Sequence, residues 1–432
     1  MNRILYLFLL LIFITGCSLN KNSKFWTSSK KIKLEKGFKE VLQIDENINK
    51  ELNPNFKIKL NKNLNTLSRS KNLYNNEGRL NFDGNLEKSS RYKFSKIQSF
   101  HEYEPQISFY KDNLVFFDNK GSILKFNKNS KLIWKKNYYS KSEKKQNPIL
   151  QFANNNKYLI VGDNIAKYYL LDLKSGNLIW LKNNLAPFNS QIKIYDDKFF
   201  IIDFSNTLRC FSIKNGDELW NVATQNSLIR SKKKLSMVIH ENKIYFNNSL
   251  GDITAVDIEK GQLLWQLPTQ NSLIYESAFS LEASDIVADD ETIYFSNNKN
   301  QFFSLDIKSG SFNWKNNINS NLRPVIVDNF LFTITLEGYL TIIEKNSGNI
   351  IRITDVFKNI KPKKRKKIKP TGFIVGTNNI YLSTSNGRLL VIDITSGNTI
   401  STLKIDNEKI SRPSVKDNNL FVIKDNAVIK LN

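Results

Sequence analysis

The sequence has little of what catalytic and metal-binding sites usually require. Its 432 residues include only two cysteines and two histidines. The histidines, His101 and His240, do not stand in a metal-ligand spacing. There is no glycine-rich phosphate loop and no supportable Ser-His-Asp order. We therefore expect no catalytic residues, no metal site and no cofactor.

The apolar run at the N-terminus, Ile4 to Ile14, is too short to span a bilayer as a helix and has the length of a signal-peptide core. It ends in Ile-Thr-Gly-Cys at Cys17, which resembles the lipobox of bacterial lipoproteins. The resemblance implies removal of residues 1–16 and lipidation of Cys17. Because Ser18 rather than Asp follows, it also implies a lipid-anchored protein at the periplasmic face of the outer membrane. A plain secretory signal with a chance cysteine is the alternative.

If Cys17 is lipidated, Cys210 is the only thiol left, and no intramolecular disulfide can form. Cys210 lies in the apolar strand pattern Leu-Arg-Cys-Phe-Ser-Ile. We expect a buried, inert thiol there.

Acidic residues are outnumbered, 40 against 64 lysines and arginines, and the net charge is +24. Such a chain could bind nucleic acid or acidic lipid. The lysines are mostly spread over turns, however, and the export signal argues against nucleic acid. One dense run, Lys358 to Pro370, holds eight basic residues in 13. Contact with anionic lipid head groups and a solvated loop are both open for it.

Helical periodicity is absent, and a repeat takes its place. Phrases such as Leu-Asp-Leu-Lys-Ser-Gly-Asn-Leu-Ile-Trp recur at spacings of 38 to 49 residues. Five copies end on Trp134, Trp180, Trp220, Trp265 and Trp314, and two degenerate copies place Arg352 and Ser401 at that position. Each period reads as four short strands, which is typical of an all-β fold, the β-propeller.

The number of blades follows from the chain after Ser401, which supplies three further strands. An N-terminal strand, Ser89–Ile97, would complete that blade and remove its open edge. We predict eight four-stranded antiparallel blades closed in this way, with seven blades as the alternative. Residues 17–50 read as a polar tether, and residues 51–432 as the propeller with an irregular lead-in over 51–88.

Each part of the recurring phrase has a structural explanation. The tryptophan can brace one blade against the next. The aspartate can accept hydrogen bonds from turn N–H groups, and the glycine permits a positive φ. The regular aspartates are separated by whole blades and cannot pair for acid–base chemistry; they are Asp172, Asp257, Asp306 and Asp393.

The pattern Asp-x-x-x-Gly-x-x-x-Trp resembles the tryptophan-docking motif of the quinoprotein-like, or PQQ-repeat, propellers. Together with the lipobox it resembles the BamB family, lipoproteins of the machinery that assembles outer-membrane β-barrels. The resemblance covers about residues 70–432. It implies a non-catalytic scaffold that binds the POTRA domains of the barrel protein BamA, as a monomer within the complex beside other subunits.

The resemblance also implies binding residues. The family carries a Leu-x-Leu-Arg core after a Trp strand, and here Leu228, Ile229 and Arg230 fit its end, although Ser227 replaces the first leucine. An acidic residue one blade further on corresponds to Asp285. The alternative is that these are ordinary loop residues.

The repeat is compatible with two other functions. Quinoprotein dehydrogenases share the repeat, but they use a quinone, a carboxylate-bound calcium, an Asp base and often adjacent cysteines. This chain has no adjacent cysteine pair, and its regular aspartates are explained by turns. A propeller that binds another envelope complex or a glycan is the remaining alternative.

Overall fold

The computed structural model describes residues 48–61, 64, 73–100, 102, 105–225, 231, 233–269 and 281–432. All of these belong to one compact unit, Glu46–Asn432. The predicted signal peptide, Cys17 and most of the predicted tether lie outside the described residues. So do Leu228, Ile229 and Arg230.

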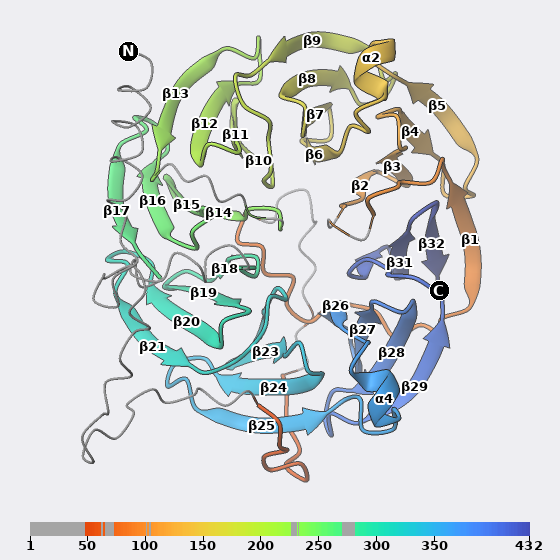
Figure 1. The fold of residues 1–432 in the computed structure, drawn as a ribbon, viewed down its shortest axis with the longest axis vertical. Helices are drawn as coiled ribbons and strands as arrows, with labels where there is room; N and C mark the ends of the chain where they lie inside the picture. The colour runs from red at the N-terminus through yellow and green to blue at the C-terminus, as the bar shows by residue number, and fades with distance from the viewer. Residues whose placement is uncertain are drawn as a thin grey trace, which may run out of the picture. The chain divides into compact units, whose positions relative to one another are not determined.

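Eight four-stranded antiparallel sheets stand around a ring (Figure 1). In each blade the strands run from the central channel outward. Blade 1 has β2 (Ser108–Tyr110), β3 (Asn113–Phe117), β4 (Ile123–Phe126) and β5 (Leu132–Lys136); blade 2 has β6 (Leu150–Asn154), β7 (Tyr158–Asp163), β8 (Lys167–Asp172) and β9 (Leu178–Asn183). Blade 3 has β10 (Lys193–Tyr195), β11 (Lys198–Ile202), β12 (Thr207–Ser212) and β13 (Glu218–Ala223); blade 4 has β14 (Met237–His240), β15 (Lys243–Asn247), β16 (Ile253–Asp257) and β17 (Leu263–Leu267).

The remaining blades have the same plan. Blade 5 has β18 (Val287–Ala288), β19 (Thr292–Asn297), β20 (Gln301–Asp306) and β21 (Phe312–Asn316); blade 6 has β22 (Val325–Val327), β23 (Phe330–Ile334), β24 (Tyr339–Glu344) and β25 (Ile350–Asp355). Blade 7 has β26 (Pro370–Val375), β27 (Asn379–Thr384), β28 (Arg388–Asp393) and β29 (Thr399–Lys404); blade 8 has β30 (Ser414–Lys416), β31 (Asn419–Lys424), β32 (Ala427–Leu431) and β1 (Lys88–Lys93).

The prediction of eight blades closed by an N-terminal strand is confirmed. β1 pairs antiparallel with β32, for example Arg91 opposite Ile429, and becomes the outer strand of blade 8. It covers Lys88–Lys93 rather than the predicted Ser89–Ile97. The helices of the described region are the single turns α2 (Lys141–Lys144) and α4 (Pro362–Arg365), and none there is long and apolar enough to cross a bilayer.

Burial explains the strand sequences. The second and third strands of a blade pack on neighbouring blades through both faces, so their residues are almost all buried, as in β15 and β16. Outer strands such as β17 alternate exposed and half-buried residues. The core is therefore a series of apolar layers between blades.

The tryptophans join neighbouring blades. The indole N–H of each donates to a turn carbonyl in the next blade: Trp134 to Lys174 (3.1 Å), Trp180 to Ile213 (2.9 Å), Trp220 to Ile258 (3.0 Å), Trp265 to Lys308 (3.1 Å) and Trp314 to Lys345 (2.9 Å). Each ring also lies against the turn glycine of that blade. A Cβ on Gly261 would lie 2.6 Å from Trp220 Cδ2, so this glycine supplies space as well as its φ of 65°.

Three junctions depart from this pattern. Between blades 6 and 7, the fully buried Arg352 takes the tryptophan position and donates to the carbonyls of Ile394 (3.3 Å) and Thr395. Between blades 8 and 1, Tyr92 of β1 donates through its hydroxyl to Lys128 O at 3.1 Å. Between blades 7 and 8, no contact of Ser401 among the described residues takes this role, and Phe82 of the lead-in packs in the apolar layer shared by the two blades.

The lead-in is more than an irregular connection. Residues 48–58 pack on blade 6, where Leu52 forms an antiparallel bridge with Ile353. Residues 73–81 then run along the central channel, drawn in orange in Figure 1. They contact blades 4 to 7 in turn through Leu73 O, Tyr74 O, Asn76 Oδ1 and Leu80 N, bonded to Ile239, Ala288, Ile326 and Val375. Thus one segment ties together blades that are far apart in sequence.

Candidate functional site

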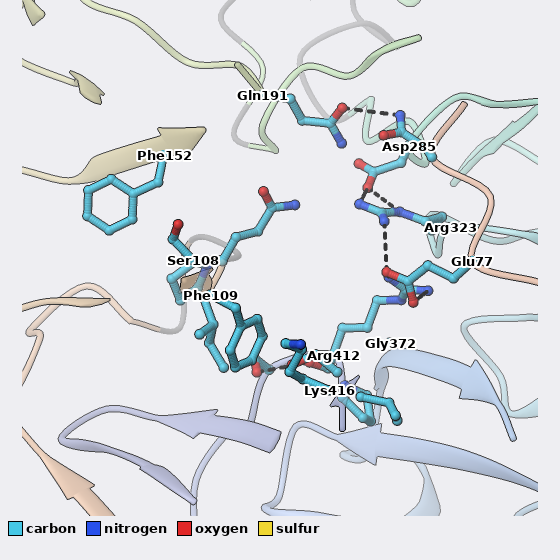
Figure 2. Close-up of a pocket in the computed structure, with 18 of the residues that line it drawn as sticks. Glu77, Ser108, Phe109, Phe152, Gln191, Asp285, Arg323, Gly372, Arg412 and Lys416 are labelled. Carbon is cyan, nitrogen blue, oxygen red and sulfur yellow. Dashed lines mark hydrogen bonds and ion pairs between the residues drawn. The ribbon is translucent and has the colours of Figure 1, made fainter. Parts of the chain in front are cut away.

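A cavity of about 800 Å³ opens at the centre of the ring (Figure 2). Its wall consists of the chain just before several inner strands and of the lead-in. Five side chains come from equivalent positions, two residues before an inner strand: Gln106, Gln191, Asp285, Arg323 and Arg412. The propeller thus brings one side chain from each of five blades to a common site.

At three of these positions, Gln191, Asp285 and Arg412, a buried serine directly before the residue fixes the backbone. Ser284 Oγ accepts from Ser296 N at 2.9 Å and donates to Asp285 O at 3.0 Å. Ser411 does the same with Ile423 N (2.9 Å) and Arg412 O (3.1 Å). These hydroxyls satisfy backbone groups that the inner strands leave unpaired, and they hold the following residue at the cavity.

One wall of the cavity carries a continuous chain of charges (Figure 2). Arg323 Nε donates to Asp285 Oδ2 at 2.6 Å, and Arg323 Nη1 lies 3.6 Å from Glu77 Oε1. Arg412 Nη1 donates to the same Glu77 oxygen at 3.1 Å. Glu77 belongs to the lead-in, so the network connects blades 5, 6 and 8 through it. Phe109 and Phe152 form the opposite wall.

Ionisation in this network follows from burial and pairing. Burial acts to raise the pKa of Asp285, but Arg323, Lys233 and Lys234 outweigh it and hold that pKa well below its usual range. Asp285 is therefore a carboxylate fully engaged by an arginine. Removing either partner of such a buried pair destabilises the folded protein, because the other charge is left unpaired.

The polar side of the cavity is formed by Asn75, Gln191 and Lys193. Asn75 Nδ2 donates to Gln191 Oε1 at 3.1 Å, and Lys193 Nζ donates to Asn75 Oδ1 at 2.6 Å. Burial lowers the pKa of Lys193 to about 7, with a further contribution from Arg323. This lysine is therefore poised to change charge near neutral pH.

The cavity does not fit a calcium-bound quinone. Within the described part of the chain no three His, Cys, Asp or Glu residues gather as metal ligands. Glu77 and Asp285, the carboxylates of the network, are each held by an arginine. A divalent cation would have to displace these arginines. The donor set instead suits positioning and binding.

Other reactive groups are equally constrained. Cys210 is buried, and burial raises the pKa of its thiol to about 12. His240 Nδ1 lies 3.0 Å from the Tyr74 hydroxyl of the lead-in. His101 lies outside the described residues. A buried thiol with a raised pKa is not activated as a nucleophile.

The predicted binding residues have different placements. Asp285 is buried in the cavity wall. Leu228, Ile229 and Arg230 lie outside the described residues, so only the residues that follow them in the chain can be placed. Lys233 Nζ donates to Asn321 O, and Asn321 Nδ2 donates to Glu282 Oε2 at 2.6 Å. The chain that follows residues 226–230 and the chain that follows residues 270–280 are therefore bridged by one residue of blade 6.

Sequence reasoning missed Glu77, Arg323 and Arg412. A signal exists for the two arginines, because Arg-Pro precedes an inner strand at Arg323-Pro324 and again at Arg412-Pro413. No local signal marks Glu77, whose partners are hundreds of residues away in sequence.

The aspartates and tryptophans of the repeat are accounted for by the ring itself. Asp172 Oδ1 accepts from Ser175 N at 2.7 Å and from Ser175 Oγ at 2.6 Å within its turn. The ring of eight blades and the tryptophan-docked turns together define a PQQ-repeat β-propeller. A family model described as outer membrane protein assembly factor BamB matches residues 119–354, more than half of the chain. The protein belongs to this family.

Solved structures agree on the fold. BamB from Moraxella catarrhalis superposes with a TM-score of 0.66 at 16% identity, covering 80% of this chain and 99% of that one. The computationally designed protein Ika8 reaches 0.61 at 13% identity, covering 79% and 99%. Quinohemoprotein alcohol dehydrogenase from Comamonas testosteroni reaches 0.61 at 11% identity, covering 84% and 79%. No curated protein sequence matches the chain significantly.

Proposed function

We propose that this protein is a non-catalytic scaffold lipoprotein of the complex that assembles outer-membrane β-barrels. It binds the POTRA domains of a BamA-like barrel protein from the periplasmic side, anchored to the outer membrane through Cys17. Membership of the BamB family is the observation that carries the proposal. The arginine-held carboxylates of the channel support a binding role rather than a redox one.

The proposed interface comprises residues 228–230 and the wall of the cavity at Asp285. Leu228, Ile229 and Arg230 supply apolar contacts and an arginine anchor, which are the residue types that dominate protein interfaces. Asn321 bridges Lys233 and Glu282, which are close in sequence to Arg230 and to Asp285 of the Asp285–Arg323 pair. In this arrangement Asp285 is a positioning residue, because its carboxylate holds Arg323 in the cavity wall.

A second element of the proposal concerns client strands. The outer strand of blade 6 already accepts an added segment, since Leu52 and Ile353 exchange backbone hydrogen bonds of 3.1 and 2.9 Å. Outer strands elsewhere present exposed apolar side chains, among them Leu132, Ile133, Leu178, Ile179, Leu263 and Leu264. Pairing with such an edge would let the scaffold hold an unfolded barrel strand near the insertion machinery.

The main test is recovery of a partner. A tagged protein extracted from outer membranes in mild detergent should bring with it a large POTRA-containing barrel protein. Recovery without such a partner would overturn the proposal.

The interface is tested by Arg230→Glu, which should reduce that recovery at least tenfold because it inverts the anchor charge. Lys214→Glu, an exposed lysine in a docking turn, is the matched control and should recover the partner fully. Equal recovery by both variants would mean that the interface lies elsewhere.

Anchoring is tested with radiolabelled fatty acid. The wild-type chain should be labelled and Cys17→Ala should not. Label on the variant would refute lipidation at this residue.

The dehydrogenase alternative is tested by incubating the protein with the quinone and calcium. We expect no spectral shift and no dye reduction, and either signal would support the dehydrogenase alternative.

A further inference from the structure

The connection between blades 6 and 7 forms a second site, on the rim of the ring. It runs from Val356 to Lys369 and contains α4, which lies next to β28 and β29 in Figure 1. Between this connection and blade 7 there is a slot of about 350 Å³. Its exposed lining is mainly apolar and includes Val356, Ile360, Ile368, Leu390 and Ile400. Polar side chains also line it, namely Asn359, Thr384, Asn386, Thr399, Ser401 and Thr402.

Two cationic side chains line this slot, and the connection beside it carries further lysines. Lys364 and Arg388 line it directly. Seven lysines of the connection are exposed, namely Lys358, Lys361, Lys363, Lys364, Lys366, Lys367 and Lys369. Among the described residues only Lys358 of these seven has a carboxylate within ion-pair distance, Glu51 at 3.6 Å. The other six lysines have no carboxylate partner within the part of the chain that the structure describes.

The connection is well ordered rather than a loose basic tail. Arg365 donates to Asp355 Oδ2 at 2.5 Å and to Glu337 O at 3.0 Å, and its guanidinium lies 5.1 Å from the Tyr339 ring centroid. Ile368 is buried against blades 6 and 7. One arginine and the apolar side chains thus hold the segment down, while its lysines remain in solvent.

The N-terminal chain meets the ring at the same place. Tyr339 donates to Asn49 O at 2.9 Å, and Glu51 Oε1 accepts from Asp355 N at 3.1 Å. Residues 49–51 therefore lie beside the basic connection, and in sequence they follow the predicted lipidation site Cys17 and residues 18–47.

We propose that this rim is a binding site for anionic membrane lipid. The phosphate-bearing head groups interact with the lysines of the connection, and an acyl chain enters the apolar slot beside Ile400. Charge complementarity and the entry point of the N-terminal chain both favour a lipid surface as the occupant. A lipid anchor together with a polybasic site gives more stable attachment than either alone, and it would orient the ring on the membrane.

The test uses residues 17–432 with Cys17→Ala, so that no acyl chain contributes, and vesicles without any partner protein. Vesicles of phosphatidylcholine with about one-third phosphatidylglycerol should sediment the protein at least tenfold more strongly than phosphatidylcholine alone, and salt should weaken the binding. Because no assembly partner is present, this site can fail without the proposed function failing, and the reverse also holds.

Two pairs of variants locate the site. Changing Lys363, Lys364, Lys366 and Lys367 to Glu together should reduce binding at least tenfold, whereas the same change at Lys131, Lys174, Lys214 and Lys308, exposed lysines of docking turns, should change it less than threefold. Equal losses would show that net charge alone is responsible and would overturn the proposal, as would unchanged binding by the first variant.

The slot is tested by Ile400→Asn, with Ile179→Asn as control, because Ile179 is the exposed isoleucine at the equivalent position of blade 2. Only Ile400→Asn should weaken vesicle binding, by severalfold at unchanged melting temperature. Inorganic phosphate should compete poorly. Competition by millimolar phosphate, or no difference between the isoleucine variants, would overturn insertion of a lipid.

Discussion

The junctions from blade 1 to blade 6 and the junctions that close the ring solve the same packing problem differently. From blade 1 to blade 6 an aromatic ring lies on a glycine and donates one hydrogen bond, as Trp220 does on Gly261. In the closing part Arg352, the lead-in and Tyr92 replace that unit. The tryptophan junctions connect blades that follow one another in sequence. The closing junctions also need segments from the two ends of the chain.

Arg352 shows what a junction requires when a buried arginine takes the place of tryptophan. Its guanidinium donates to Phe56 O at 2.9 Å as well as to the turn of blade 7. Burial lowers its pKa to about 10, opposed by Asp393, so it remains a buried cation at neutral pH. The junction gains a contact to the lead-in that a tryptophan could not make, but it requires that every carbonyl partner stay in place.

Arg352→Ala should have the largest effect on this comparison. We expect a loss of about 3–5 kcal/mol of unfolding free energy, because the change leaves buried carbonyls without a donor and opens a cavity. Trp265→Ala, at a half-buried side chain, should cost about 2–3 kcal/mol. Urea unfolding measures both. A cost for Arg352→Ala below that of Trp265→Ala would show that the closing junctions are the weaker type.

Gly261→Ala should cost about as much as Trp265→Ala, about 2–3 kcal/mol, because the new Cβ meets Trp220 and φ is positive. The double variant with Trp220→Ala separates the two causes. If the ring is the obstacle, Gly261→Ala should cost only about 1 kcal/mol when Trp220 is absent. An unchanged cost would mean that glycine is required at this position for its backbone conformation alone.

Lys193 tests how the lead-in is held on the tryptophan-docked part of the ring. Its pKa is about 7 in the folded protein and near 10.5 when unfolded, so between these values the unfolded chain binds the extra proton. Stability should therefore rise by about 1 kcal/mol per pH unit from pH 7 to 9. Lys193→Met should flatten this slope in urea titrations, and the exposed control Lys214→Met should not. Equal slopes in all three proteins would contradict the assignment.

Asp172→Ala should have the smallest effect, about 1 kcal/mol, because it removes turn hydrogen bonds near the surface. Bonds from Ser175 lower the pKa of Asp172. A lowered pKa contributes stability above the unfolded value and loses it as pH falls through the folded value. The difference from wild type should therefore shrink in acid. A difference that persists when the carboxyl is protonated would mean that charge is not involved.

The sequence was sufficient for the repeated part of the fold. A phrase ending on Trp, repeated in phase with four short strands, predicts blades, and three leftover strands predict closure from the N-terminus. The channel was not predictable in this way. Glu77 has its partners at Arg323 and Arg412, and nothing local in the lead-in indicates a crossing of the ring.

The candidate site was predicted less well for a related reason. The family resemblance predicts Asp285 as a binding residue, but its partner Arg323 lies on another blade, and only the fold brings the two together. Arg352 read as a lost tryptophan because its replacement bonds reach Phe56, far earlier in the chain. A single sequence reports patterns, not distances between remote residues.

The pairing of β1 with β32 also constrains how the protein folds. Arg91 and Asn426, bonded across this closure, are 335 residues apart. Closure of the ring is therefore an event of very high contact order and should be late and slow. Until the last strand is available, β1 has no partner and the charges of the channel have no complete wall. A chain truncated before Ala427 should therefore remain a chaperone client rather than become a smaller propeller.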